Sequence, residues 1–289
     1  MAHLYTGTCS WKYNSWRGLI YSEKKEINYL EEYARYYNSV EIDQWFWSLF
    51  GMDKVSLPRR EVVEEYLQSV PLEFKFTIKV PNSITLTHFY RKSKNAPLKR
   101  NPYFLSPKLF AEFLQTISPM QARVGMLMFQ FEYLNKQKMR DQYEFHQALT
   151  GFFKQVTRDF PYAIEPRNPQ YLNRAYFDFL NRNKLSHVFL QGYYMPSIIE
   201  VYEKFRDQIF GSTVIRLHGG DRKEIEEKSG EQWNRIWEDR SDELRSVADM
   251  IKDLQSRGVT VFLNVNNHYE GSAPLTIRRI ENLMKGDKL

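Results

Sequence analysis

Apolar stretches of strand length alternate along the chain with segments whose apolar residues recur at helical spacing. Eight of the short stretches are bounded by turn residues or polar loops, and each therefore predicts a β-strand. Between them, sets such as Phe145, Leu149, Phe152 and Val156 predict helices. The predicted strands are Tyr5–Trp11, Val40–Phe46, Phe74–Val80, Val124–Phe131, Tyr162–Arg167, Ser186–Gln191, Thr213–His218 and Val259–Asn266.

This alternation predicts an α/β protein with a single (β/α)8 TIM barrel, in which eight parallel strands lie inside a ring of outer helices. One domain is expected to occupy residues 1–289. An open, doubly wound sheet is the alternative, but no G-x-G-x-x-G or Walker loop follows the first strand. Two long connections, 81–107 and 219–232, follow predicted strands at their carboxyl ends, where barrel enzymes keep their functional loops.

Polar side chains share one face in six of the eight predicted strands. In the second strand, for example, Glu41 and Asp43 alternate with Val40 and Ile42. The face that packs against helices must be apolar, so the polar face is expected to line the barrel near its carboxyl-terminal mouth. The polar residues expected there are Glu41, Asp43, Thr77, Lys79, Gln130, Glu165, Arg167, Arg216, His218, Asn264 and Asn266.

Burying ionisable groups costs several kcal/mol each unless they are paired, which favours a catalytic or ligand site as the reason for keeping them. The alternative is a purely structural salt-bridge network, because three acidic side chains are balanced by three basic ones. The acidic ones are Glu41, Asp43 and Glu165, and the basic ones are Lys79, Arg167 and Arg216.

The composition is that of a soluble, folded protein, with 42% hydrophobic and 26% charged residues, and it excludes a disordered or fibrous chain. No apolar run approaches the roughly 18 residues of a membrane-spanning helix, and no export signal follows Met1, so a cytoplasmic protein is expected. The single cysteine, Cys9, excludes an intramolecular disulfide and a site of several thiolates; a small buried residue is the expected role.

Lys and Arg outnumber Asp and Glu by 41 to 35, which mildly favours anionic ligands, either a small molecule or a nucleic acid. Aromatic residues make up 16% of the chain and can form either core or stacking surfaces. Five basic residues without an intervening acid suit phosphate contacts, and they are Arg91, Lys92, Lys94, Lys99 and Arg100. Tryptophans near strand ends could stack on a base or sugar, and these are Trp11, Trp16, Trp45 and Trp47.

Several strand-end motifs together resemble the YecE-like family, catalogued as domain of unknown function 72. The resemblance covers nearly the whole chain, in order, and implies a TIM barrel without supplying a reaction or catalytic residues. Cys9 stands where this family usually has a serine. The motifs are Gly7-Thr-Cys-Ser-Trp11, Val40-Glu-Ile-Asp43 with Phe46, Phe74 to Pro81 with Thr87-His88, Gly125 to Gln130, Ala163-Ile-Glu-Pro-Arg167 with Pro169, Ile215-Arg-Leu-His-Gly219, and Asn266-Asn267 with Gly271 to Pro274.

The residue types at the predicted mouth suit acid–base chemistry on an anion. Glu165 with either Glu41 or Asp43 can form a pair of carboxylates whose pKa values are pushed apart, and His218 can exchange a proton near neutral pH. The basic groups Lys79, Arg167 and Arg216 suit a carboxylate or phosphate. Further candidates for substrate binding are Trp11, Asp43, His88, Gln130, Asn264, Asn266 and Asn267.

The best-supported prediction is a hydrolase or lyase that acts on a small anionic or phosphorylated substrate at the barrel mouth. A nucleic-acid-binding or processing protein that uses the loop 91–100 is the alternative, and a non-catalytic metabolite binder is the second alternative. A divalent metal held by Glu41, Glu165, His218 and His88 is not favoured, because basic residues already balance the acids. No cofactor is identified.

Overall fold

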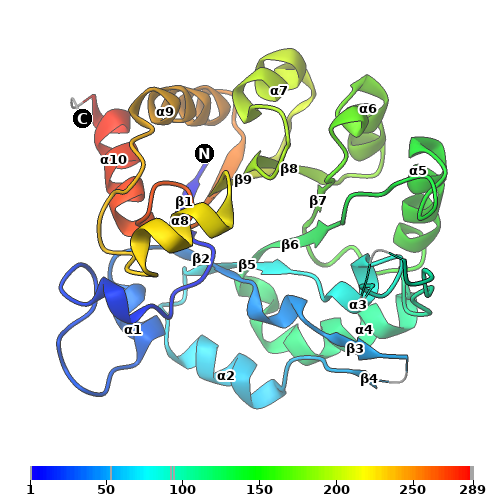
Figure 1. Cartoon of the computed structure of the whole chain (residues 1–289), viewed down its shortest axis with the longest axis horizontal. Coiled ribbons are helices and arrows are strands. Elements are labelled where there is room, and N and C mark those ends of the chain that lie inside the picture. Colours follow the sequence, from blue (N-terminus) through cyan, green and yellow to red (C-terminus); the bar gives the residue numbers. More distant parts are fainter. Residues whose placement is uncertain (1, 53, 92, 94, 287–289) are drawn as a thin grey trace.

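Eight parallel strands form the centre of the molecule in the computed structural model, which describes residues 2–52, 54–91, 93 and 95–286 (Figure 1). They are hydrogen-bonded in the order β1-β10-β9-β8-β7-β6-β5-β2. From β2 to β10, each strand therefore lies beside the next barrel strand along the chain, and β10 lies beside β1. All eight predicted strands are confirmed. The strands are β1 (Leu4–Thr8), β2 (Ser39–Ile42), β5 (Lys75–Lys79), β6 (Val124–Gln130), β7 (Tyr162–Glu165), β8 (Ser186–Gly192), β9 (Ser212–Gly219) and β10 (Thr260–Val265).

Helices surround these strands, as expected for crossovers between parallel strands (Figure 1). The fold is therefore the predicted (β/α)8 TIM barrel, nearly closed. The helices are α1 (Tyr29–Tyr33), α2 (Arg60–Gln68), α3 (Asn82–Thr85), α4 (Pro107–Ile117), α5 (Gln142–Phe153), α6 (Arg174–Arg182), α7 (Ile198–Phe205), α8 (Arg222–Ser229), α9 (Ser241–Ser256) and α10 (Ala273–Lys285). Within the described residues, no helix is long and apolar enough to cross a membrane.

Buried apolar side chains form two separate layers. The larger one lies between strands and helices and includes Phe110, Phe129 and Ile215. The smaller one consists of alternate strand residues that point into the barrel, and it is a separate cluster because the strands divide it from the outer core. Its members are Met126, Met128, Ala163, Val188, Val214 and Phe262. The polar residues of the same strand face follow these later along the strands, at the carboxyl-terminal mouth.

One glycine is required inside the barrel. The register shifts between β5 and β6, because Phe76 pairs with Val124 but the next residue, Thr77, pairs with Met126. Gly125 is thus an extra residue without a partner on β5, as in a β-bulge. A Cβ atom at Gly125 would lie 2.3 Å from the Phe262 ring, so the ring fills the barrel only because this position has no side chain.

Side chains close the line between β1 and β2, where strand pairing is absent from the described residues. The backbone N–H of Thr8 donates to the Tyr33 hydroxyl at 2.8 Å, and that hydroxyl donates to the carbonyl of Ser39 at 3.1 Å. Farther down, the N–H of Thr6 donates to Asn38 Oδ1 at 2.7 Å. We call this line the β1–β2 seam; Tyr33 and Asn38 satisfy the backbone groups that a strand ladder would otherwise pair.

Several details differ from the sequence-based expectation; the first strand, for example, ends at Thr8, before the predicted end at Trp11. The second strand ends at Ile42, and residues 44–46 form a 3-10 turn, η2 (Gln44–Phe46), in place of the predicted strand end. A short antiparallel pair, β3 (Leu49–Gly51) and β4 (Lys54–Val55), follows it and was not expected. Both features lie beyond the carboxyl end of β2, where the chain leaves the barrel and alternation no longer reports which side faces inward.

Candidate functional site

A fully buried arginine organises the polar side of the barrel interior. Arg216 on β9 is 1% exposed, and its Nε and Nη2 donate to the two oxygens of Glu41 on β2 at 2.8 and 2.6 Å. Its Nη1 donates to Glu165, the last residue of β7. The bidentate geometry matches the fork of a guanidinium to a carboxylate, so Arg216 joins opposite walls of the barrel.

The same pairing continues outward to Arg167. Its Nε and Nη2 contact Glu165 Oε1 at 2.8 and 2.7 Å, and its guanidinium lies 4.6 Å from the centre of the Tyr193 ring. We call Glu41, Glu165, Arg167 and Arg216 the buried charge network. Two acids and two bases leave it with no net charge.

Three neutral side chains complete the hydrogen bonding of the network. Gln130 Oε1 accepts from Arg216 at 3.3 Å. Asn264 Nδ2 donates to Glu41 Oε2 at 3.1 Å and to Thr77 Oγ1 at 2.9 Å. Each of these residues was predicted to face the barrel interior, and each does.

Electrostatics fix the ionisation of Glu165. Burial alone would raise the pKa of this carboxyl, but Arg216 and Arg167 outweigh burial and lower the pKa from 4.5 to about 2. Glu165 is therefore a carboxylate at any ordinary pH, which suits electrostatic positioning better than proton exchange.

Two charged groups of the mouth stay outside this pairing. Within the described part of the chain, neither Asp43 nor Lys79 forms an ion pair. Burial, followed by the charge of Glu41, raises the pKa of the half-buried Asp43 from 3.8 to about 6. Burial, followed by Arg216, lowers the pKa of Lys79, whose ammonium lies 4.0 Å from the centre of the Phe46 ring.

The structure brings Cys9 and His218 together from opposite ends of the chain. Cys9 Sγ lies 3.4 Å from His218 Nε2, and His218 Nδ1 lies 3.2 Å from the Tyr193 hydroxyl. Burial, and then Glu41, raises the pKa of the Cys9 thiol. Burial, and then Arg216, holds the pKa of His218 well below its usual range. The pair is therefore a neutral thiol beside a neutral imidazole. We call Cys9, Asp43, Lys79 and His218 the mouth groups.

Of the metal ligands considered from the sequence, Glu41 and His218 lie close together, with Cys9 beside them. One ligand atom each of Cys9, Glu41 and His218 lies within 4.8 Å of the other two, and all three residues are buried. Both carboxylate oxygens of Glu41 already accept hydrogen bonds from Arg216. A cation bound there would compete with a guanidinium, so this arrangement suits a metal poorly.

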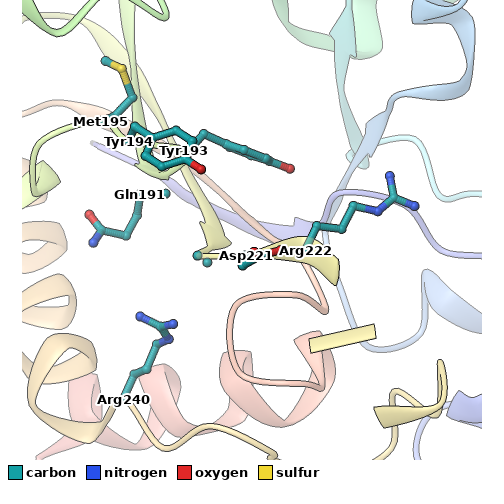
Figure 2. A pocket seen from close by; sticks show the side chains of 10 residues that line it. Gln191, Tyr193, Tyr194, Met195, Asp221, Arg222 and Arg240 are labelled. Carbon is teal, nitrogen blue, oxygen red and sulfur yellow. The ribbon is translucent and has the colours of Figure 1, made fainter. Parts of the chain in front are cut away.

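Two hollows border the mouth. One of about 600 Å³ lies at the ends of β8 and β9, and Figure 2 shows Tyr193, Asp221 and Arg240 among the side chains that line it. A second, of about 380 Å³, is lined by Gln130, Arg167 and Tyr193 together with neighbouring loop residues. Tyr193 and Tyr194 line both hollows.

The loop that carries Tyr193 has an unusual backbone. Gly192, Tyr193 and Tyr194 have successive φ angles of 126°, 54° and 62°. Positive φ is costly for residues with a side chain, and two in succession need support from their surroundings. Arg167 and His218 supply it by holding the ring and the hydroxyl of Tyr193. Sequence reasoning missed Tyr193, because no pattern singles it out from the other 18 tyrosines.

The glycine-rich turn after β9 does not leave a helix end open for phosphate. Asp221 accepts hydrogen bonds from the backbone N–H groups of Lys223 and Glu224, at 2.8 and 3.4 Å. Its carboxylate thus takes the place that an anion would occupy at the start of α8. Arg222 in turn pairs with Glu226 at 2.7 Å.

Four residues predicted for substrate binding have local contacts elsewhere. Trp11 packs edge-on against Tyr66, with 5.1 Å between ring centres. His88 Nδ1 lies 3.0 Å from Thr87 Oγ1, beside a separate hollow of about 250 Å³. Asn266 and Asn267 use their side-chain oxygens to fix the loop before α10, bonding the N–H groups of His268 and Ala273 at 2.9 Å each.

The basic loop lies beside exposed aromatic rings. Lys92 and Lys94 fall outside the described residues, whereas Lys99 and Arg100 are exposed. Trp47 and Tyr90 are 59% and 60% exposed, and their ring centres are 6.2 Å apart. Trp16 and Trp45, by contrast, are buried in the core.

Comparisons with known proteins agree with this architecture. A family model described as a protein of unknown function, DUF72, matches residues 5–288. The UPF0759 protein YecE of Escherichia coli K12 is 27% identical over 172 residues, which is 60% of this chain and 51% of YecE; YecE of strain O157:H7 matches equally. The chain therefore spans about half the length of the curated relatives it matches.

Solved structures of two DUF72 family proteins have the same fold. One from Enterococcus faecalis V583 has 18% sequence identity and a TM-score of 0.68, covering 98% of this chain and 95% of that protein. One from Thermotoga maritima MSB8 has 17% identity and a TM-score of 0.67, covering 98% and 99%. The match of the family model over nearly the whole chain shows that this protein belongs to the DUF72 family, whose description names no activity.

Proposed function

We propose that the barrel mouth is an active site that carries out acid–base chemistry on a small anionic substrate, as a hydrolase or a lyase. One observation carries the proposal: the four members of the buried charge network pair with one another, whereas Asp43 and Lys79 at the mouth form no ion pair within the part of the chain that the structure describes. Charged groups held without partners are costly in a purely structural network. A role in binding or catalysis explains why these charged side chains are present at the mouth.

Each group has a role that follows from its surroundings. Asp43, with a pKa of about 6, exchanges a proton near neutral pH. His218 stays neutral, and its contacts with Tyr193 and Cys9 orient its imidazole as a hydrogen-bonding group of the site. Lys79 and the outer edge of Arg167 attract the anionic group of the substrate. Glu41 and Glu165 act as positioning residues through Arg216 rather than as the proton-exchanging pair.

A thermal-melt screen tests the proposal with sugar phosphates, dicarboxylates and α-keto acids. A ligand at 100 times its Kd stabilises the folded chain by about 2.7 kcal/mol. At roughly 2.1 cal/mol/K of unfolding entropy per residue, 289 residues give a shift of about 4 °C. The shift should vanish in Lys79→Met and persist in Lys75→Met, whose side chain lies at the other end of β5 and donates to Ala122 O at 2.7 Å.

Ligands that give a shift are then assayed for turnover by wild type and Asp43→Asn. Turnover that falls at least about a hundredfold in Asp43→Asn supports an acid–base role, the lower end of what a general acid or base contributes. Binding without turnover for every ligand supports a non-catalytic metabolite binder. The absence of any shift from a small anion contradicts the proposal.

Nucleic-acid binding is the second candidate, supported by the exposed Trp47 and Tyr90 rings beside Lys99 and Arg100. Aromatic platforms flanked by basic residues suit single strands, whose bases stack while phosphates meet the cations. Fluorescence anisotropy with a short single-stranded oligonucleotide should then show affinity that falls steeply with salt and is lost in Trp47→Ala. Affinity that is independent of salt contradicts this candidate.

A further inference from the structure

Lys79 stands apart from the other basic residues of the barrel interior. It is 9% exposed, at the carboxyl end of β5, and its side chain faces inward on the same side of the strand as Thr77. Arg216 and Arg167 occupy Glu41 and Glu165, so the nearby carboxylates of the network are already taken. Lys79 is thus a buried amine. Its Nζ forms no ion pair with a described residue and lies 4.0 Å from the centre of the Phe46 ring.

Such surroundings destabilise the ammonium form of Lys79. Burial removes hydration from the charged form, and the guanidinium of Arg216 repels it; together they lower the pKa of Lys79. An amine that is neutral more of the time is a weaker anion holder but a stronger nucleophile. A half-buried acid, Asp43, is electrostatically coupled to it and carries a proton up to about pH 6.

We propose that Lys79 forms an imine with the carbonyl carbon of a small aldehyde or ketone bound at the barrel mouth, with Asp43 as the proton donor. This rests on the proposed function and deepens it, because it names the substrate class as an anionic carbonyl compound. In this role, Lys79 converts the carbonyl group of the substrate into an electrophilic iminium ion, as the nucleophile of a lyase does. The anionic group of the substrate is then bound by other residues.

The chemistry balances without any further reactant. The amine nitrogen attacks the carbonyl carbon, so that a C–N bond forms while the C=O π bond opens, and one proton of the nitrogen passes to the oxygen to give a carbinolamine. Asp43 protonates that hydroxyl, which leaves as water while the nitrogen electron pair forms the C=N bond. The imine keeps its proton in the cationic form and withdraws electrons from the adjacent carbon–carbon bond. Water that enters later reverses the steps and regenerates both the amine and the carboxylic acid.

The neighbours of Lys79 suit this substrate. Arg167 and Gln130, which also lie at the carboxyl ends of barrel strands, line a hollow of about 380 Å³ and offer hydrogen-bond donors to a carboxylate or phosphate. The carboxylate that Asp43 becomes after donating its proton can take a proton from the carbon next to the imine. A compound with a carbonyl one or two atoms from its anionic group therefore fits both features.

Reductive trapping tests the inference. The full chain is incubated separately with pyruvate and with glycolaldehyde phosphate in the presence of sodium cyanoborohydride, and the products are mapped by peptide mass spectrometry. A trapped imine adds the mass of the probe less one oxygen atom. We expect more label at Lys79 than at the exposed Lys223, since the lowered pKa of Lys79 leaves more of its amine neutral.

Two variants act as controls. Lys79→Arg cannot form an imine, so the adduct should be lost, and a cooperative melting curve shows that this variant is still folded. Lys75→Arg, at the other end of β5, should keep the adduct at Lys79. Labelling spread over surface lysines with none at Lys79 overturns the inference for both probes.

The outcomes also separate this inference from the proposed function. A thermal shift with a carbonyl-free anion, together with no adduct at Lys79, overturns the covalent role and leaves the mouth as an anion site. No shift and no adduct with any probe overturns both. An adduct at Lys79 that Asp43→Asn slows at least about tenfold supports both, because general-acid assistance commonly contributes more than this.

Discussion

Removal of the Arg216 guanidinium tests whether the buried charge network holds the barrel together. In Arg216→Met the side chain keeps a similar length and apolar volume, but Glu41 and Glu165, both 0% exposed, lose their shared partner. Breaking a buried pair in this way costs about 3–5 kcal/mol, because a charge is left without compensation.

The expected change in melting temperature follows from the size of the chain. An unfolding entropy of roughly 2.1 cal/mol/K per residue gives about 0.6 kcal/mol/K for 289 residues. The loss therefore corresponds to a fall in Tm of about 5–8 °C, measured by circular dichroism at pH 7. Urea denaturation provides a second measurement of the same free energy of unfolding.

A double variant separates charge imbalance from lost packing. Glu41→Gln combined with Arg216→Met removes one charge of each sign and leaves Glu165 paired with Arg167. This double variant should melt at a higher temperature than Arg216→Met alone. The deficit of Arg216→Met should also shrink between pH 7 and pH 4, because an unpaired buried carboxylate takes up a proton readily. A double variant that melts below the single one would refute the reasoning.

Three further predictions concern single groups. The pKa of Glu165 is lowered from 4.5 to about 2, so ionised Glu165 stabilises the fold fully above about pH 4.5, and this stabilisation is lost as the pH falls toward 2. The difference in free energy of unfolding between wild type and Glu165→Gln should therefore narrow over that window, and a constant difference contradicts this. The pKa of Asp43 is raised from 3.8 to about 6, so ionisation costs stability above about pH 6; Asp43→Asn should be more stable than wild type at pH 8 but not at pH 4, as measured by urea denaturation. Tyr33→Phe should lower the free energy of unfolding, measured by urea denaturation, by about 1–3 kcal/mol, because it leaves buried backbone groups without a hydrogen bond. The control Tyr37→Phe removes a hydroxyl that has no hydrogen bond within the described residues, so it should lower this free energy less. Equal losses contradict the role of Tyr33.

The strands and their inward faces could be predicted because alternation is a local property. Once β9 is recognised, Arg216 and His218 must lie on the same face, and a helix-covered outer face leaves them only the barrel interior. Alternation stops where a strand stops. Trp11 was assigned to the first strand, but β1 ends at Thr8, so its side chain follows the loop and packs on Tyr66 instead.

Pairing between distant strands could not be predicted from the sequence. Cys9 and His218 are 209 residues apart, and only the closure of the barrel, with β1 beside β10 and β10 beside β9, brings them to 3.4 Å. The sequence likewise counted three acids and three bases without showing that Arg216 would take two of the acids. Because Arg216 pairs with Glu41 and Glu165, Lys79 is left without an ion pair among the described residues, and the covalent proposal depends on this.

The β1–β2 seam also has a consequence for how this chain behaves among other proteins. A sheet that stops short of full closure has two edge strands, and an open edge can recruit a strand from another molecule. Here the edges are hidden in two ways. Tyr33 and Asn38 occupy the hydrogen-bonding groups of β1, and Gly7 brings the strands so close that even a Cβ atom would lie 2.0 Å from the carbonyl oxygen of Ser39. No room remains for a foreign strand, so the seam protects the barrel against edge-to-edge aggregation although it lacks a ladder.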